Sequence, residues 1–160
     1  MDINKTYEKR FENMKWYIKE FKDLSINELY EIVKSRFEVF VCGQKIDEQD
    51  FDDVDKKCAH IFCIDNDRVV AYSRIIPKGI SYDAPSIGRV LVLDSYRRRG
   101  LAVEMMNRAI EYIKDVYKEK EIILSAQEYV VALYKSVGFE EISEVYLEAG
   151  IPHKKMKKYL

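Results

Sequence analysis

The stretch IGRVLVLDSYRRRGLAV, at positions 87–103, contains residue types that suit the binding of an anionic ligand. An apolar run is followed by a short polar turn, by Arg97, Arg98, Arg99 and Gly100, and then by an amphipathic helical pattern. The first amides of a helix lack an intrahelical acceptor, and the helix dipole adds about half a positive charge at that end. The stretch therefore predicts a binding site for phosphate or pyrophosphate.

The individual residues of the turn fit an anion site. Glycine at position 100 lets the backbone approach a ligand without a Cβ in the way, and Ala102 is small for the same reason. The three arginines would add charge-assisted donors. A basic run before a glycine is equally typical of a solvated helix start, so the turn alone leaves both interpretations open. Because GxGxxG and Gly-Lys-Ser/Thr are missing, neither a dinucleotide-binding turn nor a P-loop is indicated.

Two motifs in sequence order resemble the GNAT superfamily of acetyltransferases. Arg97-x-x-Gly100-x-Ala102 matches the signature R/Q-x-x-G-x-G/A, and the later segment LYKSVGF (133–139) resembles LYxxxGF. The flanks are similar to the subgroup named after ElaA at Val39–Val41, Gln44, Ala71–Arg74, Ile87–Val90, Ser125–Gln127, Glu144–Glu148 and Gly150–His153. Gly43 and the segment 46–48 differ from that subgroup's pattern, at positions where an acceptor could bind.

The resemblance implies an enzyme that transfers an acetyl group from acetyl-CoA, its co-substrate, to a primary amine of a small molecule or peptide. The diphosphate of CoA would lie on the amides of the turn, and the pantetheine would add like a strand beside the preceding apolar run. An amide near Val92 would stabilise the oxyanion that develops on the thioester. The implied contacts are Val90, Leu91, Val92, Arg97, Arg98, Arg99, Gly100, Leu101, Ala102, Val103 and Gln127.

The resemblance also implies that Tyr134 is the general acid. A phenol of pKa about 10 can protonate a departing thiolate whose conjugate acid has a pKa of about 8.5. A tyrosine on an amphipathic helix can also serve in packing alone. Gln127 would hydrogen-bond the pantetheine or a water molecule.

The sequence does not assign the general base that would deprotonate an acceptor amine. Glu128 is near Gln127 in sequence, His60 lies in an expected strand where a core role is more typical, and His153 follows Pro152. Arg89 interrupts an apolar strand, and we expect it to form a structural ion pair before any substrate contact.

The segment 47–55 contains six carboxylates. They could attract a cationic acceptor, although solvated carboxylates are the default expectation. Asp50-x-Asp52 lacks the glycine and the terminal glutamate of a calcium loop, so we expect no metal site.

Hydrophobic periodicity indicates the elements that must position these residues. Strands are expected at 15–21, 60–64, 69–76, 87–93, 122–126, 142–147 and 153–159, and helices from a capping box at 25–28 to about 41, from 100 to 116, and at 130–137. This order predicts an α+β fold of α/β three-layer type. We expect one mixed, mostly antiparallel sheet of about seven strands with helices on both faces, as one domain over 1–160.

Composition limits the alternatives. In 160 residues, 27 Lys and Arg nearly balance 28 Asp and Glu, so no global field would attract nucleic acid or a membrane. No apolar run approaches a membrane span and no signal peptide is evident, so we expect a cytoplasmic protein, which could be a homodimer. Cys42, Cys58 and Cys63 include no Cys-x-x-Cys pair, and the last two are expected to be buried thiols.

Other functions stay open at this point. A non-catalytic acyl-CoA-binding module or sensor would keep the phosphate turn without turnover. An acyltransferase for longer chains or an oxygen acceptor would need a wider pocket. A nucleic-acid-binding role would rest on Arg97 to Arg99 alone and ranks last.

Overall fold

The computed structural model describes residues 13–160. Along the chain it forms β1 (Lys15–Glu20), α2 (Ile26–Arg36), β2 (Ala59–Asp65), β3 (Arg68–Ile76), β4 (Ser86–Val92), α3 (Leu101–Tyr112), β5 (Glu121–Gln127), α4 (Val131–Ser136), β6 (Glu140–Glu141), β7 (Tyr146–Glu148) and β8 (Ile151–Tyr159). Short π-helical segments extend α2 to Gly43 and α3 to Tyr117. The expected helices and most strands are present, and the expected α+β architecture is confirmed.

The capping box at the start of α2 is formed by the residues that the sequence indicated. The Glu28 amide donates to Ser25 Oγ at 3.0 Å, and the Ser25 amide donates to the Glu28 carboxylate at 2.9 Å. Both bonds satisfy amides that the helix itself leaves without an acceptor.

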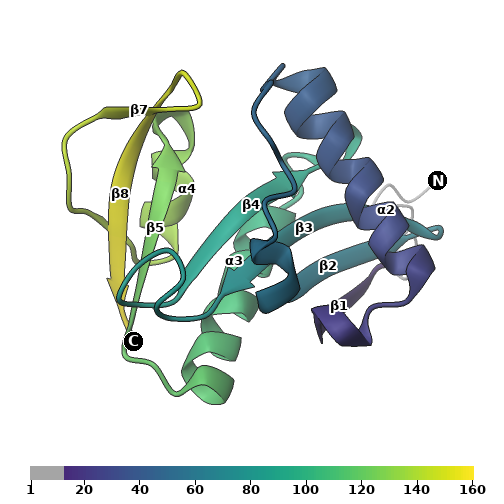
Figure 1. The fold of residues 1–160 in the computed structure, drawn as a ribbon, viewed down its shortest axis with the longest axis horizontal. Helices are drawn as coiled ribbons and strands as arrows, with labels where there is room; N and C mark the ends of the chain where they lie inside the picture. Colours follow the sequence, from purple (N-terminus) through teal and green to yellow (C-terminus); the bar gives the residue numbers. More distant parts are fainter. Residues whose placement is uncertain (1–12) are drawn as a thin grey trace, which may run out of the picture.

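The strands form two four-stranded sheets instead of the single mixed sheet that was expected. The first has the order β1-β2-β3-β4, and in the second β5, β6 and β7 all pair with β8; every pairing is antiparallel. Near the start of β4, the Ile123 amide donates to the Pro85 carbonyl at 3.1 Å. From there β4 and β5 diverge (Figure 1). The two strands are therefore edges that face each other across a widening gap in the ladder.

The expected strand at 142–147 is the other difference. Only its last two residues, 146 and 147, are strand, as part of β7, and 140–141 makes a separate short pairing with β8. Between them Ser143 uses its side chain, because its Oγ accepts the Lys155 amide at 2.8 Å. A serine hydroxyl thus replaces part of the backbone ladder.

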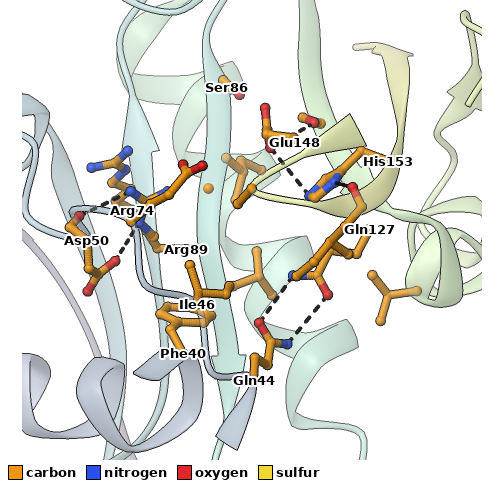
Figure 2. Close-up of a pocket in the computed structure, with 18 of the residues that line it drawn as sticks. Phe40, Gln44, Ile46, Asp50, Arg74, Ser86, Arg89, Gln127, Glu148 and His153 are labelled. Carbon is orange, nitrogen blue, oxygen red and sulfur yellow. Dashed lines mark hydrogen bonds and ion pairs between the residues drawn. The ribbon is translucent and has the colours of Figure 1, made fainter. Parts of the chain in front are cut away.

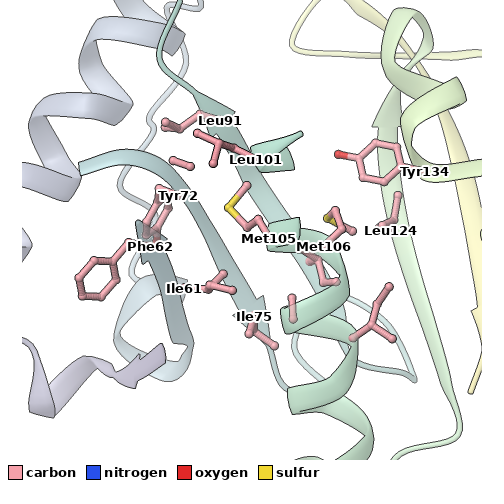
Figure 3. Close-up of a cluster of buried hydrophobic side chains, with 14 of the residues drawn as sticks. Ile61, Phe62, Tyr72, Ile75, Leu91, Leu101, Met105, Met106, Leu124 and Tyr134 are labelled. Carbon is pink, nitrogen blue, oxygen red and sulfur yellow. The ribbon is translucent and has the colours of Figure 1, made fainter. Parts of the chain in front are cut away.

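Helices cover both faces of the first sheet (Figure 1). Residues 69–76 of β3 are all buried, as expected for a strand that is covered on both sides. On one side, α2 is joined to β3 by the Ser35 hydroxyl, which donates to the Val69 carbonyl at 2.6 Å. On the other side, α3 contributes Met105 and Met106 to a core that continues to Leu124 on β5 (Figure 3). This shared core holds the two sheets together where their hydrogen bonding is interrupted.

Candidate active site

A pocket of about 390 Å³ lies where β4 and β5 separate. Figure 2 shows Arg74, Arg89 and Asp50 on one side of it and Gln127, Glu148 and His153 on the other. The remaining lining comes mainly from the end of α2 and the loop after it, from the loop before β4, and from α4 and the turn that precedes it. The pocket therefore joins segments that are far apart in the sequence.

A β-bulge shapes the β4 side of the pocket. Register with β3 shifts between Tyr72 and Arg74, and Arg89 has a φ of +53°, which is unusual for a residue with a side chain. The Ser73 hydroxyl donates to the Gly88 carbonyl at 3.0 Å, so a side chain satisfies a backbone group at the irregularity. A bulge bends its strand and re-aims a side chain. Here it directs β4 away from β5 and Arg89 toward the pocket wall.

The expected ion pair of Arg89 is confirmed. Its Nε donates to Asp50 Oδ1 at 2.7 Å, and its Nη2 donates to the Asp50 carbonyl at 3.1 Å. Asp50 also accepts from Arg36, a residue of α2 whose side chain is 2% exposed. The Asp50 carboxylate thus links the loop that follows α2 both to α2 itself and to the bulge in β4.

The expectation that the carboxylates of 47–55 are solvated is wrong for Asp50 and Asp55, whose side chains are each 11% exposed. Asp50, Asp52 and Asp55 face Arg36, Arg74 and Arg89 from separate elements. Hydrogen bonds from Arg74 lower the pKa of Asp52 to about 2. A buried guanidinium requires carboxylate partners, and this segment supplies them.

Tyr134 lines the pocket from α4 and is 5% exposed. Its ring packs edge-on against Phe139, with centroids 6.1 Å apart, and its hydroxyl points away from β5 toward the side where Leu101 lies (Figure 3). Burial raises the pKa of the Tyr134 phenol well above its usual range. The phenol is therefore protonated at neutral pH and can donate a hydrogen bond or a proton into the pocket.

Gln127 is paired with Gln44, a residue that the sequence singled out only as part of a resemblance. Gln127 Nε2 donates to Gln44 Oε1 at 3.2 Å, and Gln44 Nε2 donates to Gln127 Oε1 at 3.4 Å and to the Tyr129 hydroxyl at 2.9 Å. Figure 2 shows this amide pair at the edge of the pocket. It connects the C-terminal end of the α2 segment to the end of β5.

The turn before α3 has the features of an anion site. Gly100 has a φ of +78°, a Cβ there would meet nothing within 4 Å, and no side chain caps the helix. Arg98 also has a positive φ, of +61°. Arg99 lies over the Tyr96 ring at 5.2 Å. The start of α3 thus presents backbone amides toward open space beside exposed arginines.

Three of the residues that the resemblance implicated have other contacts. Arg97 Nε donates to the Val92 carbonyl at 3.1 Å, so Arg97 supports the turn and occupies an acceptor at the end of β4. Leu101 and Leu91 are core residues, 5% and 3% exposed, so only their backbone could meet a ligand. Val90 lines the pocket, and Val92 is half-buried.

The three candidate general bases have different surroundings in the structure. His60 is a core residue as expected, because its nitrogens contact the Tyr72 hydroxyl at 2.8 Å and the Asp55 carbonyl at 2.9 Å, and burial lowers its pKa. Glu128 is not among the residues that line the pocket. His153 does line it, 3.3 Å from the Glu148 carboxylate.

Cys58 and Cys63 are buried, which raises the pKa of both thiols to about 12. Within 13–160, no group of three His, Cys, Asp or Glu side chains has the geometry of a metal site. None of the helices described there is long and apolar enough to cross a membrane.

A bulged β4, a β5 that separates from it, and an uncapped helix start after an R-x-x-G-x-A turn together define an acyl-CoA-dependent transferase fold. The sequence matches the family described as "Acetyltransferase (GNAT) domain" over residues 24–160. The chain therefore belongs to the GNAT acetyltransferases, which use acetyl-CoA to transfer an acetyl group.

Within that family the chain is ElaA-like. It is 33% identical to protein ElaA of Escherichia coli over 142 residues, covering 88% of this chain and 93% of ElaA. The crystal structure of that ElaA superposes with a TM-score of 0.85, covering 91% of this chain and 99% of ElaA.

Two other relatives support the same assignment. A UPF0039 protein of Schizosaccharomyces pombe is 40% identical over 147 residues, which cover 91% of this chain and 97% of that protein. An acyl-CoA N-acyltransferase from Pseudomonas aeruginosa is 33% identical, with a TM-score of 0.85 and coverage of 91% of this chain and 99% of that one.

Proposed function

We propose that this protein transfers the acetyl group of acetyl-CoA to a primary amine of a small molecule or peptide, by direct attack of the amine on the thioester. The observation that carries this proposal is the pocket between the β4 and β5 edges, which is lined by the phenol of Tyr134. Burial keeps that phenol protonated, as a general acid requires. Tyr134 would give its proton to the departing thiolate.

The chain offers contacts suited to the rest of acetyl-CoA. The uncapped start of α3, with Gly100 open to solvent and Arg98 and Arg99 exposed, suits a diphosphate. The unpaired edge of β4 at Val90 and Leu91 suits addition of the pantetheine as a strand. Gln127 would hydrogen-bond the pantetheine from the opposite edge if its amide exchanges away from Gln44.

The amine acceptor is supported by the same pocket. The Pseudomonas aeruginosa relative, at 33% identity, is an acyl-CoA N-acyltransferase, so nitrogen is the acceptor atom in a protein of the same fold. No covalent enzyme intermediate is needed, because a neutral amine can attack a thioester directly. The enzyme must position both substrates, stabilise the oxyanion and manage the protons.

Calorimetric titration with acetyl-CoA and with CoA, followed by a thiol-release assay over a panel of amines, tests the proposal. We expect both nucleotides to bind and at least one primary amine to accelerate thiol release. Binding without release by any amine would replace the amine transferase with an acyl-CoA sensor or a transferase for another acceptor. Failure of both to bind would refute the assignment of the α3 turn.

A further inference from the structure

The strand pair β7–β8 places an acid and a base next to each other on the pocket wall. His153 on β8 is 6% exposed, and its ring stacks on Tyr146 with centroids 6.2 Å apart. Its Nδ1 lies 2.7 Å from the Ile151 carbonyl oxygen, and its Nε2 lies 3.3 Å from Glu148 Oε2. Figure 2 shows both side chains at the pocket, on the side opposite the arginines.

The hydrogen bond to Ile151 determines what His153 can do. A carbonyl oxygen only accepts, so Nδ1 must carry the proton, and the neutral ring then directs the lone pair of Nε2 at Glu148. Two acceptors 3.3 Å apart make no favourable contact until a proton or a donor lies between them. A primary ammonium has three N–H donors and can satisfy both groups at once.

The charge of the pocket favours a cation. Among residues 13–160, no lysine lines the pocket, and its two arginines belong to the network in which Arg36, Arg74 and Arg89 face Asp50, Asp52 and Asp55. Three positive and three negative charges in that network cancel. Glu48 and Glu148 also line the pocket, so its remaining charge is negative.

We propose that Glu148 binds the ammonium of a cationic small-molecule acceptor and that His153 Nε2 takes its proton. This inference rests on the proposed function and names its substrate class and its general base. The acceptor nitrogen loses two protons in the overall reaction. The first goes to His153 and then to solvent, which leaves a neutral amine that forms the C–N bond as the C–S bond breaks. Tyr134 gives its phenol proton to the departing thiolate. The second proton of the nitrogen then returns to the Tyr134 oxygen, so the net result is one proton moved from the nitrogen to the thiol sulfur.

Neighbouring groups keep this pair in place. Ser125 Oγ on β5 contacts Tyr146 and lies 3.3 Å from Glu148 Oε2, so Glu148 is held from a second strand. Burial, with Tyr146 and Glu148 nearby, raises the pKa of Tyr82, so this phenol stays neutral. On β8, Lys155 Nζ lies 5.5 Å from the centre of the Tyr82 ring.

Imidazole NMR tests the binding half of the proposal independently of turnover. The chain has 2 histidines, and His60 is buried in the core, so the spectrum has an internal reference. With CoA present at pH 8, we expect butane-1,4-diamine to shift the His153 resonances and to leave those of His60 in place. Butane-1,4-diol, which has the same length and no charge, should shift neither. Equal effects of diamine and diol, or no effect of either, would overturn the proposal.

Two variants divide the roles of the pair. We expect Glu148→Gln to weaken diamine binding about tenfold, since one charge-assisted contact is lost. We expect His153→Gln to lower kcat with the best amine of the panel about a hundredfold. Its residual rate should rise with pH until the free amine itself is neutral, because the amine must then lose its proton to water.

The exposed Glu144→Gln on the same segment serves as the control and should match the parent in both assays. Calorimetry with acetyl-CoA distinguishes this proposal from the more general one. Unchanged acetyl-CoA affinity with normal amine kinetics in both variants would refute the roles of Glu148 and His153 and leave the acetyltransferase intact. Loss of acetyl-CoA binding in the parent protein would refute the general proposal instead.

Discussion

Replacement of Asp50 by Asn should destabilise the fold, because this carboxylate serves two arginines at once. It accepts from Arg36 Nε at 2.9 Å and from Arg89 Nε at 2.7 Å, and its own side chain is 11% exposed. Removing one partner of a buried pair typically costs about 3–5 kcal/mol. Arg36 keeps its contact with Asp55 at 2.6 Å, and Arg89 is 30% exposed, so part of the loss is offset.

We therefore expect Asp50→Asn to lower the free energy of unfolding by about 2 kcal/mol, with a fall in Tm of about 4–8 °C for a chain of this size. Urea unfolding followed by circular dichroism measures the change, and an unchanged m-value would show that the unfolded state is the same. Asp53→Asn on the same loop is the matched control, because Asp53 is 83% exposed and its ion pair within residues 13–160 is with the exposed Lys56. Equal stability of the two variants would refute the interpretation that the network holds the loop.

Three further predictions concern Tyr134, Gly100 and Asp52. Tyr134→Phe keeps the packing against Phe139, so it should lower kcat about a hundredfold with little change in acetyl-CoA affinity or Tm; full activity across the pH range would exclude the acid role. Gly100→Val should weaken CoA binding, measured by calorimetry, at least about tenfold. Gly79→Val is the control, because Gly79 has a similar positive φ and equally open surroundings, so the substitution imposes comparable strain but should leave CoA affinity unchanged. Equal CoA affinities of the two variants would refute the phosphate site. Stability should fall as pH drops from about 5 toward 2, because the folded-state pKa of Asp52, about 2, lies below its unfolded value and its contribution is present only above that range. Acid titration of Asp52→Asn should lack this part of the loss, of about 1 kcal/mol after discounting for exposure, and a curve that matches the parent would contradict the assignment.

His60 adds to the acid sensitivity in the same direction. Burial lowers its folded-state pKa, so below about pH 6.5 His60 binds a proton in the unfolded chain but stays neutral in the folded chain. Stability should therefore begin to fall before Asp52 titrates. If the free energy of unfolding of the parent falls between pH 7 and 5 and that of His60→Gln stays constant, the loss comes from His60. An equal fall in both proteins would refute this explanation.

The sequence by itself determined the features that depend on neighbours along the chain. The capping box of Ser25 and Glu28, the turn that ends at Gly100, and the alternation of helical and extended periodicity all act within a few residues. The pairing of β2 with β3 follows from the two-residue connection between them, Asn66 and Asp67. These local rules, together with the two motifs, were sufficient for the α+β architecture and for the family, but not for the division of the strands into two sheets.

Only the tertiary structure decided which side chains meet. Arg89 and Asp50 are 39 residues apart, and Gln44 and Gln127 are 83 apart, so no periodicity connects them. The bulge at Arg89 and the separation of β4 from β5 depend on such partners. The solvated or buried state of a carboxylate likewise depends on which elements pack together, and so does the position of the Glu148–His153 pair on the wall of the pocket. Ion pairing and burial depend on distances in space, whereas the sequence shows which residues are charged and not which of them lie close together.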